Sequence, residues 1–398
     1  MLAQQGCTVL KILKTLVFYG IVKGQNTIGD HTVLKSFLFK VKDHRRKQGR
    51  RYELGHILLF AILAILSGAT SYRKIHQFIV AHYDPLDEIF ELDWERMPAH
   101  TTLRDIIQGT SGRELEQRFR QYSQQLAKSD DQKQFIGCDG KVLRGSFDQF
   151  KDQKAVQILS AFVSNSRLIL AHQEIATKTN EIPTAQGLME KLGLSGYVFP
   201  FDALHCQEKT LETAKKTGNE VIVQVKGNQK TLFNDCQTIA ETTIPDEVYQ
   251  EPLTKARNRI ESRKVEIFIS PTLTDDQKWI LVKVVVKVAR YRQRFDTKTK
   301  AWKNSAETSF YISTIVLSAQ EFCQAIRNHW GIENRNHHVR DVTMGEDKSR
   351  IRTNPHIFAK LRSFALNILR KNKVENVSLA LFDNSMNLDN VLNYVGVL

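Results

Sequence analysis

The sequence is poor in cysteine, with five among 398 residues. They are odd in number, far apart, and never arranged as a C-x-x-C pair. This pattern argues against a disulfide scaffold or a structural zinc site, and it favours a reducing cytosol. The five positions are Cys7, Cys138, Cys206, Cys236 and Cys323.

Long apolar segments and repeats are also lacking. The longest uninterrupted apolar run, residues 57–66, is too short to span a bilayer. An apolar stretch at 9–22 lacks the charged segment that precedes the apolar part of a secretory signal. We interpret both as core helices, and we expect a bacterial cytoplasmic, nucleoid-associated protein with no membrane partner.

Acidic residues are outnumbered by basic ones, 43 to 57, which leaves a net charge of +14. An excess of this size favours a polyanionic partner, of which nucleic acid is the commonest. A basic protein without such a partner is the alternative. The chain is otherwise typical of a globular protein, with 41% hydrophobic and 25% charged residues, and its length allows two or three domains.

The densest positive charge lies at residues 40–51, KVKDHRRKQGRR. It leads into HILLFAILAILSGA, which is apolar on nearly every face and therefore predicts a buried helix. Amphipathic helices are expected at 72–82, 101–109 and 113–127. After an uncertain segment at 1–30, residues 31–130 thus predict a helical, basic DNA-binding domain; a solvated charge run is the alternative. The candidate DNA contacts here are Arg45, Arg46, Lys47, Arg50 and Arg51.

Residues 131–229 alternate between strands and helices. Apolar, β-rich runs at 156–164 and 168–176 are separated by a hairpin signal, Asn165-Ser166. A helix at 183–192, a strand at 197–201, a helix at 207–217 and a strand at 221–225 follow. With a first strand ending near Asp139, this is the order of a ribonuclease H-like α/β fold with a mixed sheet. The first and fourth strands are neighbours in that fold, so Asp139 and Asp202 would face each other.

The segment 134–146, QFIGCDGKVLRGS, has an unusual sequence for a buried strand. Its apolar run is broken by Asp139, and the cations Lys141 and Arg144 follow. A carboxylate backed by cations suits a divalent metal held against a phosphate. An Asp-Gly turn in a β-hairpin is the alternative.

Residues 230–315 predict a β-rich insertion with strands at 264–269, 279–289 and 308–316. A basic segment lies between the last two: Arg290, Arg292, Arg294, Lys298, Lys300 and Lys303.

The core is expected to resume at 316–372, before a C-terminal tail at 373–398. Ser318 and Glu321 form a capping box for a helix reaching about Val339. One polar face of this helix carries His329, Glu333, Asn336, His337 and Arg340. A salt-bridged surface face is the alternative interpretation.

Two acids at strand ends and a third on a helix predict a site for two Mg²⁺ ions acting on a phosphodiester. Carboxylates are needed because Mg²⁺ prefers anionic oxygen, and Mn²⁺ is the expected substitute. For the third acid we favour Glu333 over Asp341, because Glu333 lies well inside the predicted helix and a ligand needs a rigid mount.

The sequence resembles the DDE transposases of bacterial insertion sequences, specifically the H-repeat-associated subgroup. The matching segments span residues 50–370 in family order: RRYELGHILLFAILAILSGA, PAHTTLRDI, CDGKVLRGSFD, KTNEIP, FDALHCQ, VKGNQ, HWGIENRNHHVRDVTMGED and a tail around 362–370. The resemblance implies DNA strand cleavage and joining, with Asp139, Asp202 and Glu333 as the acids. Its expected partners are terminal inverted repeats, target DNA and a second copy of the chain on paired ends. Further candidate DNA contacts are Lys141, Arg144, Lys226, His329 and Arg340.

The chain departs from the broader relatives around Glu333. They place a Tyr, an Arg and a Lys at seven before, four before and seven after this acid, where Ile326, His329 and Arg340 stand here. A phosphate contact through His329 would be weaker and pH-dependent. A domesticated or inactive transposase-derived DNA-binding protein, and a host nuclease with the same core, are the alternative functions.

Overall fold

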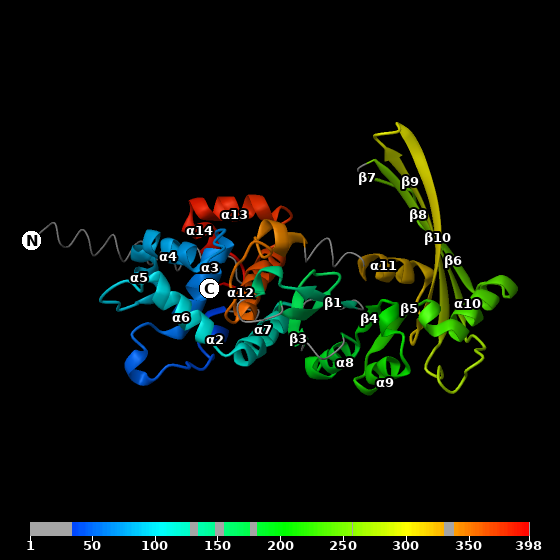
Figure 1. Ribbon diagram of the computed structural model, residues 1–398, viewed down its shortest axis with the longest axis horizontal. Helices are drawn as coiled ribbons and strands as arrows, with labels where there is room; N and C mark the ends of the chain where they lie inside the picture. Colours follow the sequence, from blue (N-terminus) through cyan, green and yellow to red (C-terminus); the bar gives the residue numbers. More distant parts are fainter. Residues whose placement is uncertain are drawn as a thin grey trace, which may run out of the picture.

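A computed structural model describes residues 34–127, 134–147, 155–175, 181–256, 258–329 and 338–397. The segment 1–30, the apolar stretch 9–22 and Glu333 lie outside these ranges. The molecule is elongated (Figure 1): a helical region occupies one end, a mixed α/β part follows, and a ribbon of strands projects from the far end. Within the described ranges no helix is both long and apolar enough to span a bilayer.

The helical region is organised around one buried helix, α3. All 13 residues of α3 are buried, as its continuous apolar sequence predicts. The other helices in the first part of the chain are amphipathic and cover it. Their bounds are α2 Leu34–Leu38, α3 Leu54–Leu66, α4 Tyr72–Ala81, α5 Tyr83–Phe90, α6 His100–Gly109 and α7 Gly112–Ala127.

The C-terminal residues complete this same helical region. They form α12 Pro355–Lys371, α13 Val377–Met386 and α14 Leu388–Leu392, which share one apolar core with α3. The Leu34 N–H donates to the Gly396 carbonyl at 3.2 Å, so the two ends of the described chain meet. Residues 373–397 of the segment expected to be a tail, 373–398, therefore belong to the helical region, and α12 packs on α3 and α7 as well as on β3.

The mixed α/β part follows the predicted order of elements. Three antiparallel strands come first, and two parallel strands with their helices follow. The bounds are β1 Ile136–Val142, β2 Gln157–Val163, β3 Ile169–Ile175, α8 Glu181–Leu192, β4 Val198–Phe201, α9 Glu208–Lys216 and β5 Glu220–Val225. Phe135 forms a parallel bridge with Val198, and the Val198 N–H donates to the Gln134 carbonyl at 3.1 Å. The first and fourth strands are therefore neighbours where they begin.

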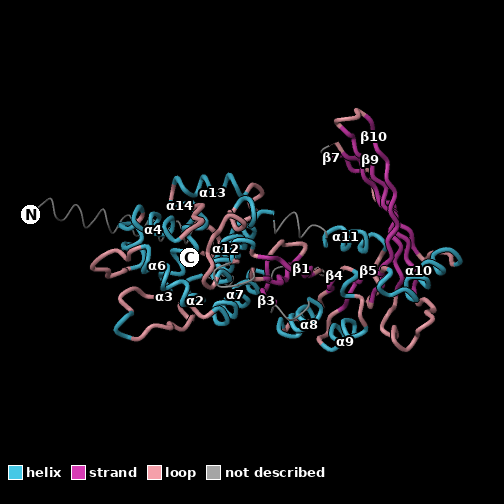
Figure 2. The backbone as a smooth tube through the Cα atoms, in the orientation of Figure 1, coloured by secondary structure: helices cyan, strands magenta, loops and turns pink. Residues whose placement is uncertain are grey.

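The β-rich segment is present, but it is not a separate subdomain. Its last strand pairs with β5, so the sheet runs β4-β5-β10-β9-β8-β6 without interruption, with β7 paired to β8. Figure 2 shows these strands passing from the body into the ribbon. The elements are α10 Lys230–Thr242, β6 Glu247–Gln250, β7 Thr254–Ala256, β8 Arg259–Ile269, β9 Val284–Asp296 and β10 Ala301–Ser313.

Two expectations within this segment are corrected. The strand expected at 279–289 begins only at Val284, because Trp279 is 3% exposed in a turn and packs into the core under α10. The basic segment is not a connection between strands: Arg290, Arg292 and Arg294 are themselves part of β9.

Helix α11, Ala319–His329, begins with the predicted capping box. Glu321 accepts a hydrogen bond from the Ser318 N–H at 2.9 Å, and Ser318 Oγ accepts one from the Glu321 N–H at 3.2 Å. Beyond residue 338 the chain forms a further helical turn, Val339–Thr343. Gly345 ends this turn with a φ of +65°, a conformation that favours glycine.

Candidate active site

The two faces of the sheet are covered by different helices. Phe135 and Val198 pack with Phe322 of α11 on one face, whereas Ile136 and Phe199 pack on the other, which α8 and α9 cover. Successive strand residues point to opposite faces, so every second position of β1 from Phe135 belongs to the α11 face.

The parallel bridge at the start of β1 and β4 puts positions 139 and 202 at equal distances along two neighbouring strands. Position 139 stands four residues after Phe135, and Asp202 stands four residues after Val198, the partner of Phe135 in the parallel bridge. Position 139 is itself in β1, paired with Ser160 of β2. The Asp139 side chain lies outside the description, so the contact between the two carboxylates stays a prediction.

Asp202 is exposed and held by its own backbone. Its Oδ1 accepts a hydrogen bond from the Leu204 N–H at 3.0 Å, and its carbonyl accepts one from the His205 N–H at 3.2 Å. These bonds cap the short turn Ala203–His205 directly after β4. An exposed carboxylate in a fixed orientation can offer its other oxygen to a hard cation such as Mg²⁺.

A further acid, Glu181, was not assigned a role from the sequence. A Cβ placed on Gly140 would lie 3.2 Å from Glu181 Oε2, so this carboxylate lies against the residue that follows Asp139. The Nε2 atom of the buried His205 is 3.7 Å from Glu181 Oε1. Glu181 belongs to the KTNEIP segment and lies in the first turn of α8. An acid at the start of the helix after the third strand was the sequence feature that could have indicated this residue.

The predicted ligands fit a hard divalent cation, since they are carboxylates and not thiolates. Among the side chains that the structure describes, no three His, Cys, Asp or Glu are close enough to hold a metal ion. Two of the three predicted ligands, the Asp139 side chain and Glu333, are not in that set.

A buried ion-pair cluster lies next to position 139. Lys141 Nζ contacts the carboxylates of Asp341 and Glu346. Glu346 also accepts a hydrogen bond from Arg340 at 2.8 Å, and it lies 3.8 Å from Arg362 of α12. The cluster joins β1, the segment after α11 and the helical region.

The charges in this cluster are strongly coupled. Burial alone would raise the pKa of Glu346, but Arg340, Lys141 and Arg362 outweigh it and hold that pKa well below its ordinary value of 4.5. Burial lowers the pKa of Arg362 to about 10, although Glu346 opposes the shift.

This cluster corrects two predicted DNA contacts. Lys141 is 8% exposed and Arg340 is 1% exposed, and both are paired with Glu346, so neither reaches the surface to meet a phosphate. Asp341, the competing third acid, is likewise engaged by Lys141.

The other predicted DNA contacts near the sheet are more open. Arg144 is exposed and lies 3.6 Å from Asp347, and Lys226 is exposed directly after β5. His329 is partly buried and ends α11.

The basic run at 40–51 divides into two groups. Arg45 pairs with Asp43 at 2.7 Å, and Arg50 donates to the carbonyl oxygens of Arg45 and Asp43. Both therefore stabilise the loop. Arg46, Lys47 and Arg51 are exposed, and Arg51 comes no closer than 3.9 Å to an acid, Glu95. These three are the cations of the run best placed for DNA.

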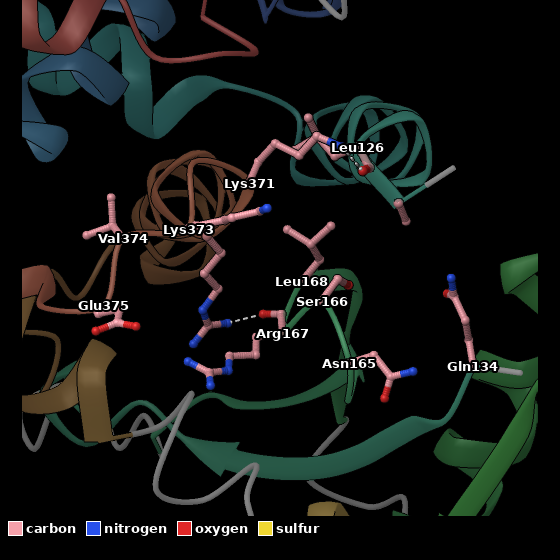
Figure 3. A pocket seen from close by; sticks show the side chains of 12 residues that line it. Leu126, Gln134, Asn165, Ser166, Arg167, Leu168, Lys371, Lys373, Val374 and Glu375 are labelled. Carbon is pink, nitrogen blue, oxygen red and sulfur yellow. Dashed lines mark hydrogen bonds between the residues drawn. The ribbon is translucent and has the colours of Figure 1, made fainter. Parts of the chain in front are cut away.

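A cationic pocket lies at the other end of β1 (Figure 3). The cavity of about 490 Å³ is bordered by the β2–β3 turn and the end of α12, and Arg370 donates to the Arg167 carbonyl there. Burial and the nearby Arg167 lower the pKa of Arg370 to about 9. The charged residues that line the cationic pocket are Arg167, Arg370, Lys371, Lys373 and Glu375. Gln134, at the start of β1, also lines it, so the pocket is separate from the carboxylate site.

Comparison with known families decides the identity of the chain. The model of the transposase DDE domain matches residues 84–369, and the model of the DDE_Tnp_1-associated region matches residues 35–123. The chain belongs to the transposase DDE domain family. The transposase falls in the H-repeat-associated subgroup, as its motifs indicate.

Two relatives from Escherichia coli (strain K12) match most of this transposase. It is 30% identical to "Putative protein YbfL" and 29% identical to "H repeat-associated putative transposase YhhI", in each case over 84% of this chain and 89% of the relative. A solved piggyBac transposase synaptic complex with hairpin DNA matches 90% of this chain and 78% of that chain, at 10% identity and a TM-score of 0.39.

Proposed function

We propose that this transposase cleaves and joins DNA strands at the ends of an insertion sequence by two-metal-ion phosphodiester transfer. Its α/β part would be a ribonuclease H-like core, and Asp139, Asp202 and Glu333 would hold the metals. The observation that supports this most is the parallel bridge between Phe135 and Val198, from which positions 139 and 202 are each four residues away.

The assignment of Glu333 rests on the described segments on either side of it. Helix α11, which ends four residues before Glu333, packs on the face of Phe135 and Val198. After Glu333, the segment that includes Asp341 and Glu346 is bound to Lys141, two residues from position 139 and so on the same face. Since both flanks meet this face, we expect Glu333 to join the two aspartates there.

The residues of the chain would orient the metals and the substrate. Two Mg²⁺ ions, with Mn²⁺ as a substitute, would activate a water or a 3′-hydroxyl and stabilise the leaving oxygen. Asp202 is oriented for this by the turn that follows it. DNA as substrate is supported by the net charge of +14 and by the exposed cations Arg46, Lys47 and Arg51. Assembly as a dimer on paired ends stays a prediction.

The test is a comparison of acid-to-amide variants. We expect Asp202→Asn and Glu333→Gln to lose Mg²⁺-dependent strand cleavage by several orders of magnitude while they bind DNA as tightly as the wild type, because these acids hold metal and not DNA. Asp276→Asn, at an exposed position in the turn before β9, is the matched control. Strand cleavage, DNA binding and thermal unfolding are measured for each. Cleavage at a near wild-type rate in either Asp202→Asn or Glu333→Gln would refute the assignment.

A further inference from the structure

The strands β8, β9 and β10 continue beyond the core sheet as a projecting ribbon (Figure 1). β10 pairs with β5 only from Phe310 to Ser313, whereas it pairs with β9 along its whole length, from Ala301 to Ser313. Residues 301–308 of β10 are exposed. Burial in the core does not explain which side chains this part of the ribbon carries.

The register of the ribbon places six of its cations on one face. Residues directly opposite each other on antiparallel strands share a face, and successive residues alternate between faces. The rows of one face, read across β8, β9 and β10, are Arg259–Arg294–Lys303, Glu261–Arg292–Ser305 and Arg263–Arg290–Glu307. Six cations and three acids share this face, which we call the cationic face; the third acid, Asp296, stands one row further out and pairs with Lys303 at 2.7 Å.

On the opposite face of the ribbon, the positions of β9 and β10 beyond Lys287 are uncharged. From Ala289 outward its β9 and β10 positions are Ala289, Tyr291, Gln293, Phe295, Trp302, Asn304, Ala306 and Thr308. Phe295 and Trp302 pack edge to face there, with ring centroids 5.5 Å apart. Beyond Ala289, the charges of β9 and β10 thus lie on one face, which indicates a polyanionic partner for that face.

The cations are only partly neutralised within the ribbon. Glu261 is 5% exposed and is shared by Arg263, Arg290 at 2.8 Å and Arg259 at 3.3 Å. Arg292 and Arg294 form no ion pair with any residue in the described ranges, and Arg292 Nε is buried there without a hydrogen-bond partner. Positive charge on this face therefore exceeds the negative charge available to balance it.

The cationic face continues toward the candidate active site. Nearer the core, the same face carries Val286 and Val288, which pack with α11. Glu251 pairs with Arg263 of the ribbon at 2.9 Å and with Arg327 in the last turn of α11. The cationic face thus lies on the side of the sheet that α11 covers, the side expected for the acids.

We propose that the cationic face of the ribbon binds the phosphates of the DNA duplex that leads to the cleavage site. The inference rests on the proposed function, in which DNA is the substrate. A strand rises about 3.4 Å per residue, so Arg290 to Arg294 spans about 14 Å, and a duplex rises by the same amount over about four base pairs. Phosphate contacts of this kind position a duplex without reading its sequence.

The test uses a duplex of arbitrary sequence and a triple variant, Arg292→Gln with Arg294→Gln and Lys303→Gln. The slope of log affinity against log salt should become shallower by about 2 to 3 units, because each phosphate that the protein neutralises contributes about 0.9. The control is Lys255→Gln with Lys264→Gln and Lys287→Gln, which removes the same charge from the opposite face and should leave the slope nearly unchanged.

An unchanged slope in the cationic-face variant, or an equal loss in the control, would overturn the inference. If the triple variant fails to fold, Arg294→Glu at one exposed position should still weaken binding more than Lys255→Glu does. Failure of this inference is distinguishable from failure of the proposed function. In the first case the wild type still cleaves DNA and depends on Asp202; in the second it neither cleaves DNA nor depends on Asp202.

Discussion

Glu346→Gln is the substitution whose effect the structure defines most closely. The carboxylate is 4% exposed, and it faces Lys141, Arg340 at 2.8 Å and Arg362 at 3.8 Å. Glutamine keeps the shape of the side chain but removes its charge. Among the residues that the structure describes, Asp341 is then the acid left beside these three cations, and it contacts Lys141.

Removing one partner from a buried ion pair costs about 3–5 kcal/mol, and we expect the lower end, about 3 kcal/mol, because Asp341 still balances Lys141. With about 2–4 °C per kcal/mol for proteins of roughly 150–250 residues, the thermal midpoint should fall by about 6–12 °C. The assay is thermal unfolding followed by circular dichroism. Asp347→Asn is the matched control, because its pair with Arg144 is exposed and contributes about 0–1 kcal/mol.

The effect of Glu346→Gln should depend on pH. Because the folded pKa of Glu346 lies below its ordinary value of 4.5, its contribution to stability is present above pH 4.5 and is lost as the pH falls through the folded pKa. The difference in midpoint between wild type and variant should therefore shrink on acidification. A Glu346→Gln variant that melts with the wild type at neutral pH, or whose deficit is the same below pH 4.5, would refute this account of the cluster.

Two more changes test the fold and the front of the molecule. Gly145→Ala would place a Cβ 1.7 Å from the carbonyl oxygen of Ser349, so the backbone must shift and the free energy of unfolding should fall by about 1–3 kcal/mol in denaturant titration. Gly227→Ala, with open space at the Cβ position, is its control, and equal stability of the two variants would contradict the reasoning. Neutralising Arg46, Lys47 and Arg51 together should reduce the salt slope of DNA binding by about 2 to 3 units without loss of stability, and an unchanged slope would return them to a solvated face.

The parts of the fold that depend on neighbours in the chain were predictable from the sequence. Helix α3 follows from a continuous apolar run, and the start of α11 follows from Ser318 and Glu321. The order of strands and helices from β1 to β5 follows from apolar patterns and turn residues, because such signals act over only a few positions.

The parts that depend on distant partners were not predictable. The sequence does not say that β10 pairs with β5, nor that α12 covers α3. Lys141 has the sequence signature of a phosphate contact, and only its partner Glu346, some 200 residues away, shows it to be structural. The place of Glu181 was likewise not predictable, because it depends on the contact of this side chain with Gly140.

The construction of the helical region from both ends of the chain has a consequence for biosynthesis. Helix α3 leaves the ribosome early, but α12, which covers it, is made about 300 residues later. At about 5–20 residues per second, the part of the α3 surface that α12 covers stays open for roughly 15–60 s. A nascent chain in that interval is exposed to chaperones and to aggregation, and a product truncated before Pro355 never leaves this state. The helical region is therefore completed last, although its first helices are synthesised first.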